Sequence, residues 1–269
     1  MRVPFINSRF LQLSEDFMKV EILLNMLRLI SYLSPSIPEG FYQTIAAGIR
    51  KDLCCDVQLQ FEERISGPLA GDINPFAEGN ADIGFVCSPT FKYFRNELEL
   101  LPLPVPVDER ASGRAVYFSE ITVHRDSDFQ EFGQLRGKNW ALNDKNSQSG
   151  WFSMLDRIAP EPPEKYFSYL TEAGSHLESI RLLENGEVDA AGLDSNVLRY
   201  YLKNQYDPSI RIIESLGPFP IQPVVIRKNI TGELKQAVRK ALLRLHENSG
   251  DQLQSYGFNR FIEPEDGLY

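Results

Sequence analysis

Short apolar runs alternate along the chain with stretches whose apolar residues recur every three or four positions. Runs of the first kind are typical of buried strands, and stretches of the second kind of amphipathic helices. The alternation predicts an α/β protein whose parallel strands are joined by crossover helices. We expect strands at 27–32, 57–61, 81–87, 115–124, 139–142, 167–170, 188–193 and 210–215. Helices are expected at 40–53, 90–94, 150–158, 175–185, 195–203 and 232–246, with Gly186 as a left-handed cap after the fourth.

Two proline-containing segments interrupt this alternation. Prolines alternate with apolar residues in 98–107, which suits a linker or an edge strand because proline donates no hydrogen bond within a sheet. We place the first crossing between two lobes near 107–116 and the return crossing at 216–220.

The two crossings predict a two-lobed protein in which each lobe is a mainly parallel sheet flanked by helices. The first lobe is discontinuous, with residues 27–110 and 218–269, and the second lobe comprises residues 111–217. Ligands of open α/β sheets bind at the carboxyl ends of the strands, so the cleft between the lobes is the expected binding site.

Residues 1–26 are expected to form an N-terminal extension. Its first part contains charged residues and no apolar core of the length that a signal peptide requires. With Met18 and Met26 as alternative starts, the first residues are either a gene-start artefact or an ordered extension. The sequence contains no run of about twenty apolar residues, so no membrane span is predicted. The chain as written is expected to be cytoplasmic.

Composition narrows the classes of function. The formal net charge of −9 over 269 residues argues against a general nucleic-acid binder, which needs surplus Lys and Arg facing phosphates. Local dipoles and hydroxyls can still hold a small anion. The three cysteines, Cys54, Cys55 and Cys87, have the spacing of neither a disulfide framework nor a metal site, so no metal or cofactor is expected.

The segment 143–151, with sequence NDKNSQSGW, is the main candidate for a binding site. It lies between an expected strand and an expected helix, where exposed backbone N–H groups and the helix dipole attract an anion. The alternative is that Ser147 or Ser149 only caps the helix.

Four segments of the chain resemble the phosphonate-binding proteins of ABC transporters: ADIGFVCSP, LNDKNSQSGW, GSHLESIRLLENGEVDAAGLDS and LQSYGFNRFIEPEDGLY. The resemblance extends from about residue 27 to the end of the chain. It implies the type II periplasmic-binding-protein fold, in which two α/β lobes close on a ligand. The family is typically periplasmic or lipid-anchored, although neither a signal peptide nor a lipobox is visible here.

The resemblance also implies a set of anion-binding residues. Ser147, Ser149 and Gly150 would hold the phosphonate oxygens, with help from Ser34 and Ser88. Gln148 stands where the family usually has a second hydroxyl residue, which points to weaker phosphonate binding or to another oxyanion such as a sulfonate or carboxylate.

Three further residues are candidates for ligand contacts. The His176 imidazole could donate to an anion from a turn that faces the ligand in the resembling family, or it has a structural role. Asp194 could hold the ammonium group of a zwitterionic ligand and reject doubly charged phosphate, or it caps the helix that follows. Tyr42 could close over the organic part of the ligand, or it belongs to the core.

The expected function is that of a non-catalytic solute-binding protein. It would capture a small phosphonate-like oxyanion by hinge closure and present it to an ABC permease or act as a related sensor. No nucleophile elbow, Walker loop or zinc-type His pair is present in the sequence. An enzyme of menaquinone or thiamine-pyrimidine biosynthesis type on the same fold, and a regulatory module whose pocket has decayed, are the alternatives.

Overall fold

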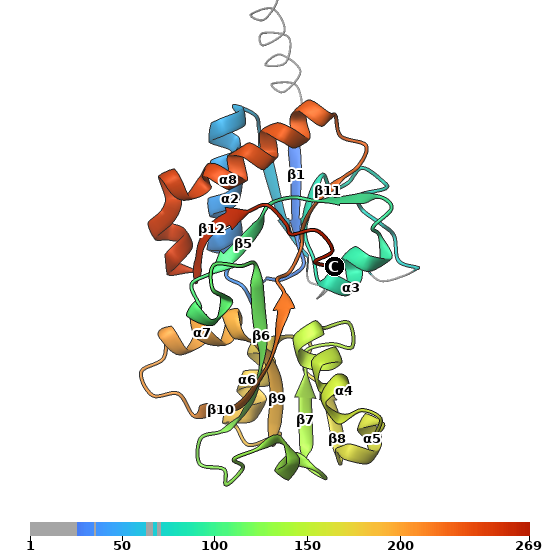
Figure 1. Cartoon of the computed structure of the whole chain (residues 1–269), viewed down its shortest axis with the longest axis vertical. Helices are drawn as coiled ribbons and strands as arrows, with labels where there is room; N and C mark the ends of the chain where they lie inside the picture. The colour runs from blue at the N-terminus through green and yellow to red at the C-terminus, as the bar shows by residue number, and fades with distance from the viewer. Residues whose placement is uncertain (1–25, 35, 63–66, 69–70) are drawn as a thin grey trace, which may run out of the picture.

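Two α/β lobes joined by two crossing segments make up the computed structural model, which describes residues 26–34, 36–62, 67–68 and 71–269 (Figure 1). The two-lobed α/β fold expected from the sequence is therefore present. The expectations for residues 1–25 concern a part of the chain outside the described residues.

The upper lobe in Figure 1 is built on a five-stranded sheet in the order β2-β1-β3-β11-β4. Its strands are β1 (Leu27–Ser31), β2 (Val57–Phe61), β3 (Ile83–Phe85), β4 (Leu98–Leu100) and β11 (Val224–Arg227). Strands β2, β1 and β3 pair in parallel, whereas β11 is antiparallel to both of its neighbours. Only β11 is therefore reversed in this sheet.

The lower lobe contains a second five-stranded sheet, in the order β10-β6-β9-β7-β8. Its strands are β6 (Val116–His124), β7 (Asn139–Leu142), β8 (Tyr169–Glu172), β9 (Ala190–Asp194) and β10 (Ile210–Pro220). Strands β9, β7 and β8 pair in parallel, and β6 is antiparallel to both β9 and β10. Here β6 is the reversed strand.

The reversed strands are the first strands that the chain enters after each crossing. Strand β6 follows the first crossing and β11 follows the second, so both begin at the junction and run away from it. The remaining strands of the two sheets consequently end at the junction. This arrangement brings the loops after β1, β3, β7 and β9 together between the lobes.

The proline-containing segment 98–107 forms two short strands. Pro104 and Pro106 lie in β5 (Leu103–Pro106), which pairs only with β12 (Phe258–Ile262) among the described strands. A two-stranded edge position tolerates the missing proline N–H groups, in agreement with the expectation from the sequence.

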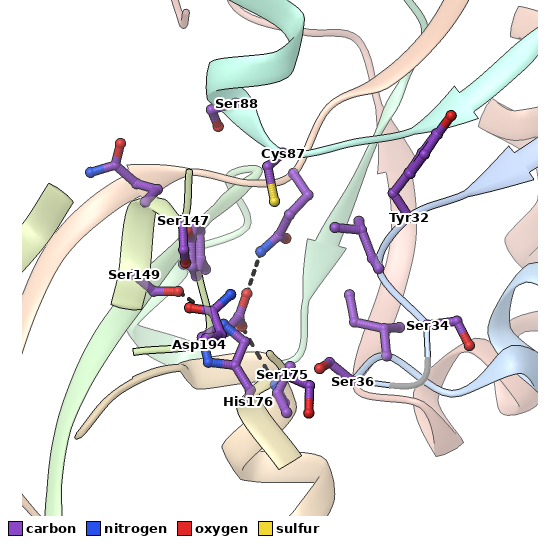
Figure 2. Close-up of a pocket in the computed structure, with 17 residues that line it drawn as sticks. Tyr32, Ser34, Ser36, Cys87, Ser88, Ser147, Ser149, Ser175, His176 and Asp194 are labelled. Carbon is purple, nitrogen blue, oxygen red and sulfur yellow. Dashed lines mark hydrogen bonds between the residues drawn. The ribbon is translucent and has the colours of Figure 1, made fainter. Parts of the chain in front are cut away.

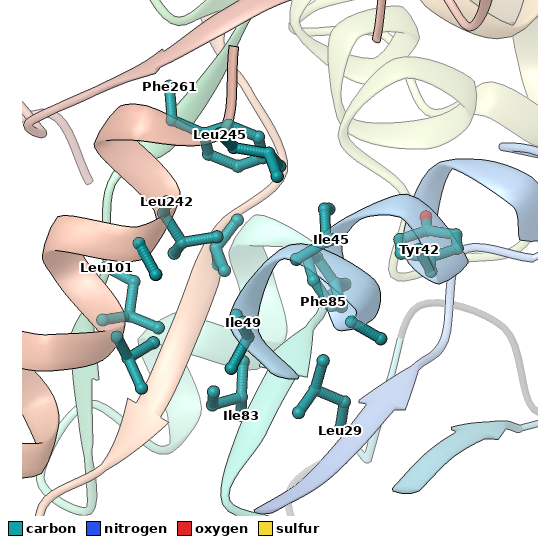
Figure 3. Close-up of a cluster of buried hydrophobic side chains, with 14 of the residues drawn as sticks. Leu29, Tyr42, Ile45, Ile49, Ile83, Phe85, Leu101, Leu242, Leu245 and Phe261 are labelled. Carbon is teal, nitrogen blue, oxygen red and sulfur yellow. The ribbon is translucent and has the colours of Figure 1, made fainter. Parts of the chain in front are cut away.

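The core of the first lobe lies between its sheet and the helices α2 (Glu39–Leu53) and α8 (Gly232–Ser255) (Figure 3). Phe41, Ile45 and Ile49 recur every four residues on α2 and are buried in this core. The adjacent residues Leu29 and Ile30 of β1 belong to different clusters, because successive side chains of a strand point to opposite faces.

The sheet of the second lobe is likewise covered on both faces. Trp140 packs with residues of α4 (Ser153–Ile158) and α5 (Pro163–Tyr166). Ala141, on the opposite face, packs with residues of α6 (His176–Glu184) and α7 (Ser195–Lys203). The remaining helix, α3 (Ser88–Tyr93), follows β3 in the first lobe.

Several element boundaries differ from the sequence prediction. The helix expected at 150–158 consists of a π-helical turn, Gln148–Phe152, followed by α4. The segment expected as the return crossing, 216–220, is still paired with β6 as the end of β10, so the chain crosses after Pro220. Helix α8 continues to Ser255 across a kink at Ser249. Gly186 has the left-handed conformation expected of it, with φ of 68°.

Candidate functional site

A small cavity lies between the two lobes, where the strand ends meet. From the first lobe it is lined by the loop after β1 and by Cys87 and Ser88 after β3. Figure 2 shows Ser147, Ser149, His176 and Asp194 of the second lobe across from Tyr32, Ser34 and Ser36. The cavity volume is about 40 Å³, room for roughly two or three water molecules. A space of this size accepts only a small chemical group.

The π-helical turn begins at the wall of the cavity. Ser147 is its N-cap, and the Ser147 Oγ accepts a hydrogen bond of 3.0 Å from the Gly150 N–H. Gln148 and Ser149 are the first two residues of the turn, whose N–H groups have no intrahelical acceptor. Ser147 therefore both caps the turn and lies beside the cavity.

His176 begins α6 and extends from the same side of the cavity. The Ser149 Oγ lies 3.2 Å from His176 Nε2, whereas Nδ1 is buried with no hydrogen-bond partner. Burial lowers the pKa of His176 to about 4, so its imidazole is neutral near pH 7. A neutral imidazole carries one N–H donor, and its orientation is set by the Ser149 hydroxyl.

Asp194 is the last residue of β9 and the N-cap of α7. Its Oδ1 accepts from the backbone N–H groups of Asn196 at 2.7 Å and Val197 at 3.4 Å. Its Oδ2 accepts from the side-chain amide of Gln222 on the second crossing. Burial raises the pKa of Asp194 to about 6, although these hydrogen bonds lower it in part.

The polar groups that line the cavity are mostly neutral. Among the described residues that line it, none is Lys or Arg, and Asp194 is the single carboxylate. Six serines contribute hydroxyl groups: Ser34, Ser36, Ser88, Ser147, Ser149 and Ser175. An anion held here would be stabilised by hydroxyls, amides and helix starts rather than by a cationic side chain.

Seven of the nine residues expected at the site line the cavity: Ser34, Ser88, Ser147, Gln148, Ser149, His176 and Asp194. Gly150 lies behind them, and its N–H is bonded to Ser147, so it is not free to reach a ligand oxygen. Tyr42 also lies away from the cavity in which a ligand contact was expected for it. It is fully buried in the core of the first lobe, with its ring centroid 4.8 Å from that of Phe85, and does not line the cavity.

Several residues that line the cavity were not predicted from the sequence. Asn143 follows β7 directly, and Tyr32 follows β1, so their places at strand ends were a signal that could have found them. Tyr117 stands at the start of β6, where the expectation of strand carboxyl ends does not apply. Gln222 lies on a crossing segment, and nothing in its local sequence distinguishes it from other linker residues.

The match to a family model decides the class of protein. Residues 29–269 match the family described as ABC transporter, phosphonate, periplasmic substrate-binding protein. The chain belongs to this family. As a family of transporter binding proteins, it accounts for two lobes with a small cavity between them.

Solved structures of similar fold include other binding proteins. A binding component of an ABC phosphonate transporter from Pseudomonas aeruginosa is 17% identical, with a TM-score of 0.75, over 90% of this chain and 82% of that one. PhnD1 from Prochlorococcus marinus, solved with methylphosphonate, is 15% identical with a TM-score of 0.70, over 91% and 94%. A Xanthomonas citri protein solved bound to ATP is 17% identical with a TM-score of 0.64, over 90% and 92%. The shared fold thus accommodates different ligands.

Direct contacts connect the second lobe of this phosphonate-family protein to the first lobe and to the first crossing. The Asn146 side-chain amide donates to the Thr90 Oγ1 at 3.3 Å, and Arg199 on α7 pairs with Asp108 on the first crossing at 3.0 Å. No helix in the part of the chain that the structure describes is long and apolar enough to cross a membrane. The described residues also contain no cluster of His, Cys, Asp and Glu suited to a metal ion.

Proposed function

We propose that this chain captures a small phosphonate-like oxyanion between its lobes, without catalysis, and presents it to an ABC permease. The observation that carries the proposal is the donor set of the cavity. Serine hydroxyls from both lobes and the start of the π-helical turn surround a space of about 40 Å³ that contains no cationic side chain. Ser34, Ser88, Ser147, Gln148, Ser149 and His176 are the proposed contacts for the anion.

Closure of the lobes would follow from this placement of donors. A ligand that contacts Ser34 and Ser88 in the first lobe and Ser149 in the second favours the conformation in which all three face it. The hydrogen bond from Asn146 in the second lobe to Thr90 in the first would be favoured by such a closed conformation. A permease would recognise the closed surface.

The Ser149 and His176 pair does not support the enzyme alternative. In a hydrolytic triad an acidic group orients the histidine through its second nitrogen. Here the His176 Nδ1 has no hydrogen-bond partner, and Asp194 is bonded to backbone N–H groups and to Gln222 instead. The contact therefore supports a positioned hydrogen-bond donor rather than an activated nucleophile.

A thermal-shift and calorimetric titration tests the proposal. The purified protein is titrated with methylphosphonate, phosphite, phosphate, a sulfonate and a small carboxylate. A ligand at a hundred times its Kd adds about 2.7 kcal/mol of stability and raises Tm by several degrees. We expect a phosphorus oxyanion to give the largest shift.

Ser149→Ala should abolish most of that shift, and Ser168→Ala, at an exposed serine of the same lobe, should leave it unchanged. If no oxyanion shifts Tm, the proposed ligand class is wrong. If the ligand is instead converted to a product during incubation, the non-catalytic assignment fails.

A further inference from the structure

The Asp194 carboxylate is bonded through both of its oxygens within the protein. Backbone N–H groups of α7 donate to Oδ1, and the Gln222 side-chain amide donates to Oδ2. Asp194 is buried, and both Asp194 and Gln222 line the cavity. A carboxylate at this place would otherwise attract a cationic group of a ligand, so a neutral amide stands where that cation would bind.

The backbone on either side of Gln222 is held in place. The Ile221 N–H donates to Ala115 O at 3.0 Å, and its carbonyl accepts from the Tyr269 hydroxyl. The next residue, Pro223, accepts at its carbonyl from the Val86 N–H at 3.3 Å. Gln222 therefore cannot leave the cavity by a simple shift of the crossing segment.

Displacing the amide would be costly for a ligand. An ammonium group that pairs with Asp194 Oδ2 would compete with the Gln222 amide and leave it without its partner in a half-buried position. The cavity of about 40 Å³ also offers little room for an additional aminoalkyl chain. A ligand with a small uncharged substituent avoids both costs.

We propose that Gln222 is a specificity-determining residue: it occupies the cation position beside Asp194, so the site favours small phosphonates with an uncharged substituent over those that carry an ammonium group. This inference rests on the proposed function, because it assumes that the phosphonate group binds in this cavity. It revises the expectation that Asp194 holds the ammonium of a zwitterionic ligand.

Paired calorimetric titrations with methylphosphonate and 2-aminoethylphosphonate test the inference. A hydrogen bond to a charged group changes binding by about tenfold or more, so we expect wild-type protein to favour methylphosphonate by at least about that factor. In Gln222→Ala the ratio of the two Kd values should fall by about tenfold. Gln205→Ala, which changes an exposed glutamine outside the cavity, should keep the wild-type ratio.

A second variant keeps the inference testable if Gln222→Ala does not fold. Gln222→Glu preserves the size of the side chain and places a second carboxylate beside Asp194, so its preference should move further toward 2-aminoethylphosphonate. A readout without ligand is the pKa of Asp194, followed by carbon NMR. Because the Gln222 hydrogen bond lowers this pKa, its loss in Gln222→Leu, which keeps the bulk of the side chain and so the burial of Asp194, should raise the pKa above about 6.

The outcomes separate this inference from the proposed function. Equal or tighter binding of 2-aminoethylphosphonate by wild-type protein would overturn the role of Gln222 while leaving phosphonate capture intact. An unchanged Kd ratio in both Gln222→Ala and Gln222→Glu, or an unchanged Asp194 pKa in Gln222→Leu, would do the same. If neither phosphonate binds folded wild-type protein, the proposed function itself fails, and this inference fails with it.

Discussion

The Ser149 hydroxyl and the His176 imidazole meet at 3.2 Å, which joins the starts of the π-helical turn and of α6 at the wall of the cavity. The two residues are 27 positions apart in the chain. Their contact fixes the direction of a neutral imidazole that a low local dielectric keeps unprotonated. Asp194, on the same side of the cavity, has its pKa moved in the opposite sense by the same burial.

Because the two pKa shifts are opposite, we expect their effects on stability to compensate each other as the pH falls. Burial lowers the pKa of His176 from 6.5 to about 4, so the unfolded chain binds the extra proton first and stability falls as pH drops through that range. The pKa of Asp194 is raised from 3.8 to about 6, so the folded state binds its proton first and stability rises as pH drops through that range. The two contributions nearly cancel.

Single substitutions should expose each contribution. Relative to wild type, Asp194→Asn should lose about 2 kcal/mol of unfolding free energy between pH 6 and 4, because only the His176 penalty remains. His176→Asn should gain about the same amount over that range. Urea unfolding at several pH values measures both differences. Parallel pH profiles for wild type and both variants would contradict the assigned pKa shifts.

Gly150 is expected to tolerate no side chain. A Cβ at this position would lie 2.1 Å from the Asn143 Oδ1, and Asn143 itself lines the cavity. Gly150→Ala should therefore displace Asn143, lower Tm by several degrees and weaken anion binding. Gly250→Ala provides the control, because a Cβ there meets nothing within 4 Å. Equal Tm values for the two variants would argue against close packing at Gly150.

Glu120 on β6 should stabilise the first crossing, on which Arg110 lies. Its side chain is 2% exposed and pairs at 2.5 Å with Arg110, which is 43% exposed, and it also accepts from the Ser215 hydroxyl. Glu120→Gln should cost about 2 kcal/mol, less than the loss of a fully buried pair because Arg110 is partly solvated and retains Asp108. Chemical unfolding measures the loss.

The exposed pair of Arg244 and Glu247 supplies the comparison for Glu120. Glu247→Gln removes the same type of charge where water screens it, and should leave the unfolding midpoint within experimental scatter. If both substitutions have the same effect on unfolding, the burial of Glu120 contributes nothing to stability.

Ile45 tests the packing of the first lobe. It is 0% exposed between the sheet and α8, as Figure 3 shows, whereas Ile73 is 80% exposed. Ile45→Ala should cost about 3 kcal/mol through lost apolar burial and the cavity left behind, and Ile73→Ala close to nothing. Calorimetric unfolding distinguishes them. A small effect at Ile45 would mean that the core relaxes around the missing atoms.

Local patterns in the sequence determined most of the elements and the class of fold. The helix at 195–203 has the predicted bounds, and the strand at 57–61 does as well, because each depends on the periodicity of its own side chains. The place of the cavity at the strand ends also followed from the sequence, since the order of elements predicts two sheets that face one junction. Residues at helix starts, such as Ser147, were recognisable for the same local reason.

The tertiary structure decided which of these residues face the cavity and what they bond to there. Asp194 and Gln222 are 28 positions apart and come from a strand end and a crossing segment, so no local pattern could pair them. The Gly150 N–H is bonded to Ser147 and Tyr42 is packed against Phe85, although either residue suited a ligand contact by its position in the sequence. Periodicity specifies which face of an element is buried, whereas hydrogen-bond partners and cavity walls depend on how distant elements pack, and only the folded chain fixes that packing.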